Sequence, residues 1–170
     1  MKFLKPKFWD KNKPNFLSYL LLPISFIFLI LSKIKIHKKK KIQNIKTICV
    51  GNIYIGGTGK TTLCIKINEI INSMGLSSCF IKKNYADQKD EQDILNNNGE
   101  LYCENSRISA LKKINSEKIS VAIFDDGLQD QKIEYDLSIV CFNKSIGPGN
   151  GFLIPSGPLR ENIKSLKKYD

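Results

Sequence analysis

Seven consecutive residues combine the side chains and spacing that bind phosphate groups. They are Gly56, Gly57, Thr58, Gly59, Lys60, Thr61 and Thr62. Glycines at these positions let backbone N–H groups point into one concavity, and a following helix adds the partial positive charge of its N-terminus. In such loops the lysine reaches the β- and γ-phosphates and the next hydroxyl binds Mg²⁺. We therefore predict that all seven residues bind a nucleotide, that Lys60 is also catalytic, and that Thr61 is a metal ligand.

The glycine pattern departs from the strict phosphate-loop pattern at one position. That pattern places a glycine five residues before Gly59, where this chain has Tyr54. The variant with paired glycines before x-Gly-Lys-Thr is satisfied. An ordinary loop before a helix is the alternative, but three glycines within four residues followed by Lys-Thr-Thr argue against it.

A second group of residues suits the metal that accompanies a nucleotide. The apolar run Val121–Phe124 leads directly into Asp125, Asp126 and Gly127. Phosphoryl-transfer sites use an acid after such a strand to hold Mg²⁺. The alternative is a strand that ends in a common Asp-Gly turn. Because the phosphate loop is present, we predict that both aspartates are metal ligands and that Asp126 is also catalytic.

These residues need a sheet that brings strand ends together. Short apolar runs predict strands, and longer periodic stretches predict helices. The predicted strands cover Ile45–Val50, Leu76–Lys82, Val121–Phe124 and Leu137–Phe142, and the predicted helices cover Leu63–Met74 and Ser106–Ser116. Alternating strands and helices predict an α/β fold, a P-loop NTPase-like, mostly parallel sheet flanked by helices. The carboxyl ends of its strands would form the ligand-binding edge.

Composition excludes several other classes of protein. The chain has 170 residues, of which 42% are hydrophobic and 25% are charged. That length supports one domain with a real core, and the apolar fraction is too high for intrinsic disorder. Five cysteines are spread without a Cys-x-x-Cys pair, and there is one histidine. This pattern indicates neither a disulfide scaffold nor a zinc site.

The net charge of +11 belongs entirely to the N-terminal segment. Residues 1–46 contain twelve lysines and one acid, Asp10, whereas the remainder of the chain is neutral. A nucleic-acid-binding domain would carry its basic patch on the folded body, so we predict no nucleic-acid partner. A basic, apolar arm instead suits an anionic membrane surface.

The arm contains an apolar run of 16 residues, Phe16–Leu31, with lysines on both sides. A transmembrane helix needs about 20 apolar residues and asymmetric flanking charge. We therefore predict a membrane-associated helix that is peripheral or monotopic, within an anchoring arm over residues 1–44 that precedes a core over residues 45–170. A true span, a signal peptide and a buried helix are the alternatives. No Ala-x-Ala-like cleavage site follows the run.

Several motifs together resemble the N-terminal portion of the tetraacyldisaccharide 4′-kinase family, the lipid A 4′-kinases. The matching stretches are Phe8-Trp9, Val50-Gly51-Asn52, the phosphate loop, Asp90-Glu91, Asp125 to Gln129, Gly149-Asn150-Gly151, and Pro155 to Glu161. They occur in the family's order. The Asp-Asp-Gly-Leu-Gln and Pro-Ser-Gly-Pro-Leu-Arg-Glu stretches are specific, whereas a phosphate loop alone is not.

The resemblance implies an activity and a set of partners. It implies ATP- and Mg²⁺-dependent phosphorylation of the 4′-hydroxyl of a tetraacylated disaccharide 1-phosphate, a glycolipid, at the cytoplasmic face of the bacterial inner membrane. It further implies that Asp90 is catalytic and helps to activate the sugar hydroxyl. Arg160 and Glu161 match a loop linked to the lipid substrate. The resemblance implies nothing about the oligomeric state or acyl-chain preference.

Three departures from the family pattern bear on activity. Lys83-Asn84-Tyr85-Ala86 stands where the family has Arg-Gly-Tyr-Gly, and Asp130 stands where it has a histidine. The chain ends at Asp170, whereas family members continue for roughly as long again with a second lobe that supplies a histidine. We expect either an N-terminal portion of a kinase or a short chain that has lost catalysis.

Two further functions fit the same motifs. A membrane-bound nucleotide switch related to partitioning ATPases also uses Gly-Gly-x-Gly-Lys-Thr, but carries a lysine just before the glycine pair, where this chain has Ile55. Nucleotide-dependent dimerisation would distinguish that switch from a kinase. A non-catalytic relic of the kinase would bind ATP without transferring phosphate.

Overall fold

The computed structural model describes residues 5–34, 39–42, 44–86, 88–114, 117–130 and 132–170. They form two compact units. The first unit comprises the described residues up to 34 with residues 52–58 and 140–169, and the second comprises residues 39–51, 59–139 and Asp170. This division differs from the one predicted after residue 44, because the N-terminal segment forms hydrogen bonds with residues near 150.

The second unit is built on a five-stranded sheet in the order β4-β3-β5-β2-β7. The strands are β2 (Lys46–Gly51), β3 (Ser78–Lys83), β4 (Leu101–Glu104), β5 (Val121–Asp125) and β7 (Leu137–Val140). The pairings β2–β5, β3–β5 and β3–β4 are parallel, with Ile48 beside Ile123 and Phe80 beside Leu101. All five residues of β5 are buried, as expected for a central strand. The predicted parallel α/β fold is confirmed.

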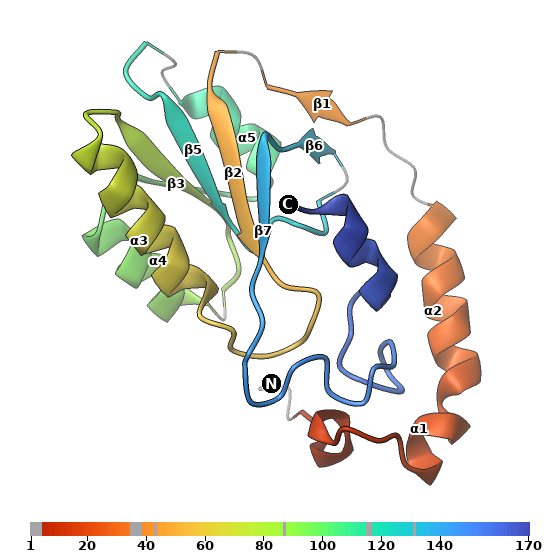
Figure 1. Ribbon diagram of the computed structural model, residues 1–170. Coiled ribbons are helices and arrows are strands. Elements are labelled where there is room, and N and C mark those ends of the chain that lie inside the picture. Colours follow the sequence, from red (N-terminus) through yellow and green to blue (C-terminus); the bar gives the residue numbers. More distant parts are fainter. Residues whose placement is uncertain (1–4, 35–38, 43, 87, 115–116, 131) are drawn as a thin grey trace. The chain divides into compact units, whose positions relative to one another are not determined.

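Three helices connect these strands and cover both faces of the sheet. They are α3 (Lys60–Ser73), α4 (Lys89–Asn97) and α5 (Arg107–Lys113). Right-handed crossovers place α3 and α4 on one face and α5 on the other, as Figure 1 shows. Two short strands, β1 (Lys40–Lys41) and β6 (Ile133–Glu134), form a separate parallel pair. The helix α4 and the strand β4 had no counterpart among the predicted elements.

Local chemistry explains where the helices begin and end. Gly59 caps α3 at its N-terminus in a left-handed conformation, and Gly75 follows its C-terminus with a φ of 76°. Helix α3 therefore begins three residues before the predicted start at Leu63. Ser106 caps α5 by accepting a hydrogen bond from the backbone N–H of Ser109. Helix α5 ends at Lys113, and residues 115–116 of its predicted range lie outside the described residues.

The first unit contains the apolar part of the N-terminal segment. Its helical elements are η1 (Lys7–Asp10), α1 (Phe16–Leu20), α2 (Leu22–Ile34) and η2 (Ile163–Lys168). Asn15 caps α1 in a reciprocal arrangement with Ser18. Of the helices that the structure describes, none combines the length and the apolar character needed to cross a bilayer.

The polar residues of α1 and α2 attach these helices to the rest of the first unit. Ser25 donates to the carbonyl of Leu153 over 3.0 Å and lies 2.8 Å from the Ser156 hydroxyl. Asn150 donates its side-chain N–H to Ser18 over 3.1 Å. Eleven large apolar side chains of the same helices are exposed: Phe16, Leu17, Tyr19, Leu20, Leu22, Ile24, Phe26, Ile27, Phe28, Ile30 and Leu31. We call this set the apolar face of α1 and α2.

Candidate functional site

The glycine-rich loop lies between β2 and α3 and is shaped by Asn52. The side-chain N–H of Asn52 donates to the carbonyl of Gly56 over 3.3 Å and to the hydroxyl of Thr58 over 3.1 Å. A side chain at Gly56 would lie 2.7 Å from the Tyr54 ring, and Gly56 has a φ of 149°. Gly59 has a φ of 74°, which also favours glycine. The loop therefore keeps the open, backbone-lined form that phosphate binding requires.

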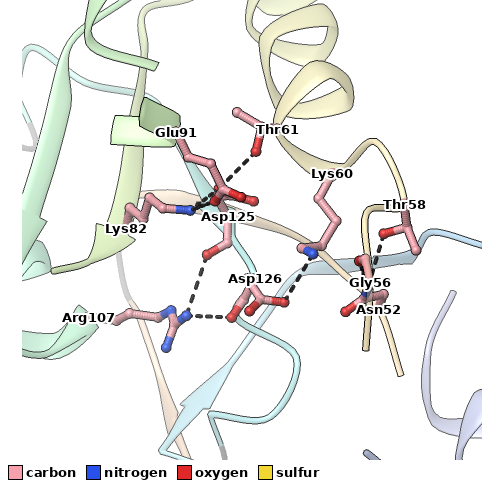
Figure 2. A network of polar contacts seen from close by, with 10 residues as sticks. All are labelled: Asn52, Gly56, Thr58, Lys60, Thr61, Lys82, Glu91, Arg107, Asp125 and Asp126. Atoms are coloured by element: carbon pink, nitrogen blue, oxygen red, sulfur yellow. Dashed lines mark hydrogen bonds and ion pairs between the residues drawn. The ribbon is translucent and has the colours of Figure 1, made fainter. Parts of the chain in front are cut away.

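The first two residues of α3 face the two aspartates at the end of β5 (Figure 2). The Lys60 ammonium lies 3.7 Å from Oδ1 of Asp126. The Thr61 hydroxyl donates to Oδ2 of Asp125 over 3.3 Å. The structure thus brings together four residues predicted from separate motifs. Thr62 and Gly57 are exposed.

Asp126 has an unusual backbone conformation. Its φ is 55°, and its N–H donates to the carbonyl of Val50 over 2.8 Å. Non-glycine residues are uncommon in this left-handed region, and such conformations concentrate at functional sites. The turn separates the two neighbouring carboxylates, so that Asp125 faces Thr61 while Asp126 faces Lys60.

Asp125 has the chemistry of a Mg²⁺ ligand. It is fully buried, and its Oδ1 has no hydrogen-bond partner within the described residues. No three His, Cys, Asp or Glu side chains in the described part of the chain form a metal cluster by themselves. Mg²⁺ with a nucleotide needs only one or two carboxylates, because phosphate oxygens and waters complete its shell. The buried carboxylate and the Thr61 hydroxyl therefore fit this ion.

Sequence reasoning missed Lys82, which is almost completely buried beside Asp125. Its ammonium lies 2.5 Å from Oδ2 of Asp125 and 2.6 Å from Oε2 of Glu91. Burial alone would lower the pKa of Lys82, but the charges and hydrogen bonds of Asp125 and Glu91 outweigh burial and raise this pKa. The available signal was a lysine near the carboxyl end of the strand, directly after the apolar residues 79–81, where ligand-binding residues gather.

Arg107 is the second residue that sequence reasoning missed, and it lies beside Asp130. The buried guanidinium of Arg107 donates to the carbonyls of Asp125, over 3.4 Å, and Asp126. It also lies 3.6 Å from a carboxylate oxygen of Asp130. The charge of Asp130 is therefore directed to this arginine.

The predicted catalytic residue Asp90 lies in the first turn of α4 and is exposed. Its side chain makes no hydrogen bond or ion pair with the residues that the structure describes. Its neighbour Glu91 holds the start of the helix through Lys82, and Gln92 donates to the carbonyl of Tyr85 over 3.1 Å. Asp90 is therefore a solvent-facing carboxylate on an anchored helix turn.

Arg160 and Glu161 belong to the first unit, where their segment pairs with the residues that enter the phosphate loop. The N–H of Arg160 donates to the carbonyl of Ile53 over 2.8 Å, and the N–H of Ile55 donates to the carbonyl of Pro158 over 2.9 Å. The carboxylate of Glu161 accepts a hydrogen bond from the Tyr169 hydroxyl. The structure thus brings the predicted substrate loop next to the entry of the phosphate loop.

Comparison with known proteins gives one consistent result. A family model described as tetraacyldisaccharide-1-P 4′-kinase matches residues 17–170. The tetraacyldisaccharide 4′-kinase of Pelagibacter ubique is 59% identical over 170 residues, which is all of this chain and 54% of that protein. The enzyme of the same name from Rickettsia canadensis is 35% identical over 178 residues and 95% of this chain. The chain spans about half the length of these curated relatives.

A solved structure has the same fold. It is a crystal structure of LpxK from Aquifex aeolicus in complex with ATP. The TM-score is 0.72 at 23% sequence identity, over 91% of this chain and 57% of that one. At this identity the likeness establishes the fold alone.

Proposed function

The chain belongs to the tetraacyldisaccharide-1-phosphate 4′-kinase family, and from this membership we propose that it binds ATP with Mg²⁺ and takes part in phosphorylating the 4′-hydroxyl of a glycolipid disaccharide. The observation that carries the proposal is the contact of two phosphate-loop residues, Lys60 and Thr61, with the two aspartates at the end of β5. ATP binding by a solved protein of the same fold supports it.

Each residue has a defined part in binding the nucleotide. The loop from Gly56 to Gly59 presents backbone N–H groups to the phosphates, and Lys60 neutralises their charge. Asp126 is the ion-pair partner of Lys60, and Asp125 and Thr61 would hold Mg²⁺. When bound, Mg²⁺ neutralises charge on the β- and γ-phosphate oxygens.

The transfer itself needs a nucleophile and a base. The sugar 4′-hydroxyl oxygen forms a bond to the γ-phosphorus while the bond from the γ-phosphorus to the bridging oxygen breaks, and ADP leaves. The hydroxyl proton passes to a carboxylate, for which we propose Asp90 because it is solvent-facing and its helix turn is anchored beside Asp125 through Glu91 and Lys82.

An amphiphilic substrate would be met at a membrane surface. We propose that the apolar face of α1 and α2 lies in the anionic cytoplasmic leaflet, with the flanking lysines at the headgroups. Arg160 would bind the glycolipid phosphate, because a guanidinium can donate two parallel hydrogen bonds to phosphate oxygens.

The test is transfer of labelled γ-phosphate from ATP to tetraacyldisaccharide 1-phosphate in mixed micelles. We expect product that disappears in Lys60→Ala and is retained in Lys66→Ala, whose ammonium is paired with Glu69 on the exposed side of the same helix. Intact Mg-ATP binding with no transfer would contradict activity of this chain by itself and limit its function to nucleotide binding.

A further inference from the structure

Lys82 occupies a position that the motifs of the sequence do not explain. It is 1% exposed, and its ammonium contacts two carboxylates on different elements, Asp125 of β5 and Glu91 of α4. In the sheet, Ile81 pairs with Phe124, so Lys82 and Asp125 are neighbours in register. Lysine is almost never this buried unless it is paired, and here the pair is at the candidate metal site.

The two oxygens of Asp125 have different surroundings. Oδ2 accepts hydrogen bonds from Lys82, over 2.5 Å, and from Thr61, over 3.3 Å. Oδ1 is buried, and no described residue forms a hydrogen bond with it. Lys82 and Thr61 thus both hold the same oxygen of this carboxylate (Figure 2), and hydrogen bonds of this kind orient a metal-binding carboxylate.

We propose that Lys82 is a positioning residue for the divalent metal: it holds Oδ2 of Asp125 and thereby directs Oδ1 toward the Mg²⁺ of the bound nucleotide. This inference rests on the proposed function. Hydrogen-bonding partners of metal ligands orient those ligands, and their removal typically weakens metal binding by about 10- to 100-fold.

Two other roles for Lys82 make different predictions. If its ammonium competes with the metal for Asp125, removing it would strengthen metal binding. If Lys82 acts only by tethering α4, removing Glu91 would have the same effect as removing Lys82. The contacts to Asp125 and Glu91 can be separated by substitution, because Glu91→Gln leaves the pair between Lys82 and Asp125 intact.

The experiment is a titration with Mn²⁺, as a spectroscopic substitute for Mg²⁺, followed by electron paramagnetic resonance with and without ATP. Asp125→Asn identifies the site under study. We expect Lys82→Met to weaken Mn²⁺ binding about tenfold or more, and Lys82→Gln, which keeps a hydrogen-bond donor, to recover part of that loss. Glu91→Gln should remain within about threefold of the native chain, and ATP affinity in EDTA should not change in any Lys82 variant.

Several outcomes would overturn the inference. These are unchanged or tighter Mn²⁺ binding in Lys82→Met, an equal loss in Glu91→Gln, or a native chain without an Asp125-dependent Mn²⁺ site. If circular dichroism shows that Lys82→Met is unfolded, the Mn²⁺ affinity of Lys82→Gln is compared with that of the native chain instead. A chain that binds no ATP but retains an Asp125- and Lys82-dependent Mn²⁺ site would contradict the kinase function while supporting the role of Lys82.

Discussion

Lys60 has one partner in the structure and would have a second in the proposed function. Its ammonium lies 3.7 Å from Oδ1 of Asp126, which is an ion pair beyond hydrogen-bonding distance. Asp126 is held independently through its own backbone, by the hydrogen bond to Val50 and by Arg107. Lys60 can therefore turn to phosphate oxygens without disturbing the aspartate that it leaves.

We expect Lys60→Ala to lower ATP affinity about a hundredfold, because it removes charge-assisted bonds worth about 3 kcal/mol in total. The melting temperature should change little, since Asp126 keeps its backbone contacts. Isothermal titration calorimetry with ATP measures the first quantity, and Lys66→Ala is the matched control. Native-like ATP affinity in the Lys60 variant would refute the phosphate-loop assignment.

At the scale of elements, one carboxylate joins β2 to the segment that precedes β7. Asp136 accepts hydrogen bonds from the N–H and the hydroxyl of Thr47, each over 2.9 Å. Burial alone would raise the pKa of Asp136, but these bonds and the nearby charges of Lys46 and Lys41 lower it below its ordinary value. The charged carboxylate is therefore the form that stabilises this junction.

The pH dependence of stability follows from the direction of that shift. The pKa of Asp136 in the folded chain lies below its value of about 4 in the unfolded chain. The contribution of Asp136 to the free energy of unfolding is therefore complete above about pH 4, and it is lost as pH falls through the folded pKa. We expect Asp136→Asn to cost about 1–2 kcal/mol in urea unfolding at neutral pH and much less near pH 3. An equal cost at both pH values would contradict this account.

The helices and strands that are most continuously apolar are the ones that the sequence predicts best. The strand before the two aspartates was predicted within one residue because it is continuously apolar and buried. Helix α4 was missed because its buried apolar side chain is Leu95 alone, so it carries little helical periodicity. The contact of Lys82 with Asp125 was also missed, because it depends on the register of two strands distant in sequence. The phosphate loop was identified because its seven residues are adjacent.

At the scale of the whole chain, charge and apolar exposure occur in the same segment. The excess of lysines lies in residues 1–46, and the apolar face of α1 and α2 lies between its two groups of lysines. Deleting this segment would also remove Trp9, which is 2% exposed and donates to the carbonyl of Pro155. Substitution on the exposed side therefore tests membrane binding without damaging the first unit.

We expect Phe16→Ser combined with Phe26→Ser to reduce co-sedimentation with phosphatidylglycerol vesicles at least tenfold. The two side chains are 82% and 64% exposed, and burying one such side chain in lipid contributes about 1.5–3 kcal/mol. Met74→Ser removes an equally exposed apolar side chain after α3 and should leave sedimentation unchanged. Unaltered sedimentation of the double variant would place the membrane contact elsewhere.

Helices α1 and α2 contact the rest of their unit through the hydroxyl groups of Ser18 and Ser25, and most of their large apolar side chains are exposed. An amphipathic helix at the surface of a water-soluble protein has the opposite arrangement, with its apolar side buried. The inward and outward positions of these helices therefore tolerate different substitutions. Ser18 and Ser25 are restricted in identity, because a larger or less polar side chain would lose the bonds to Asn150 and Ser156. For the membrane contact that we propose, the outward positions need only bulky apolar side chains. Over evolutionary time we expect the outward residues to drift among apolar types while the two serines persist.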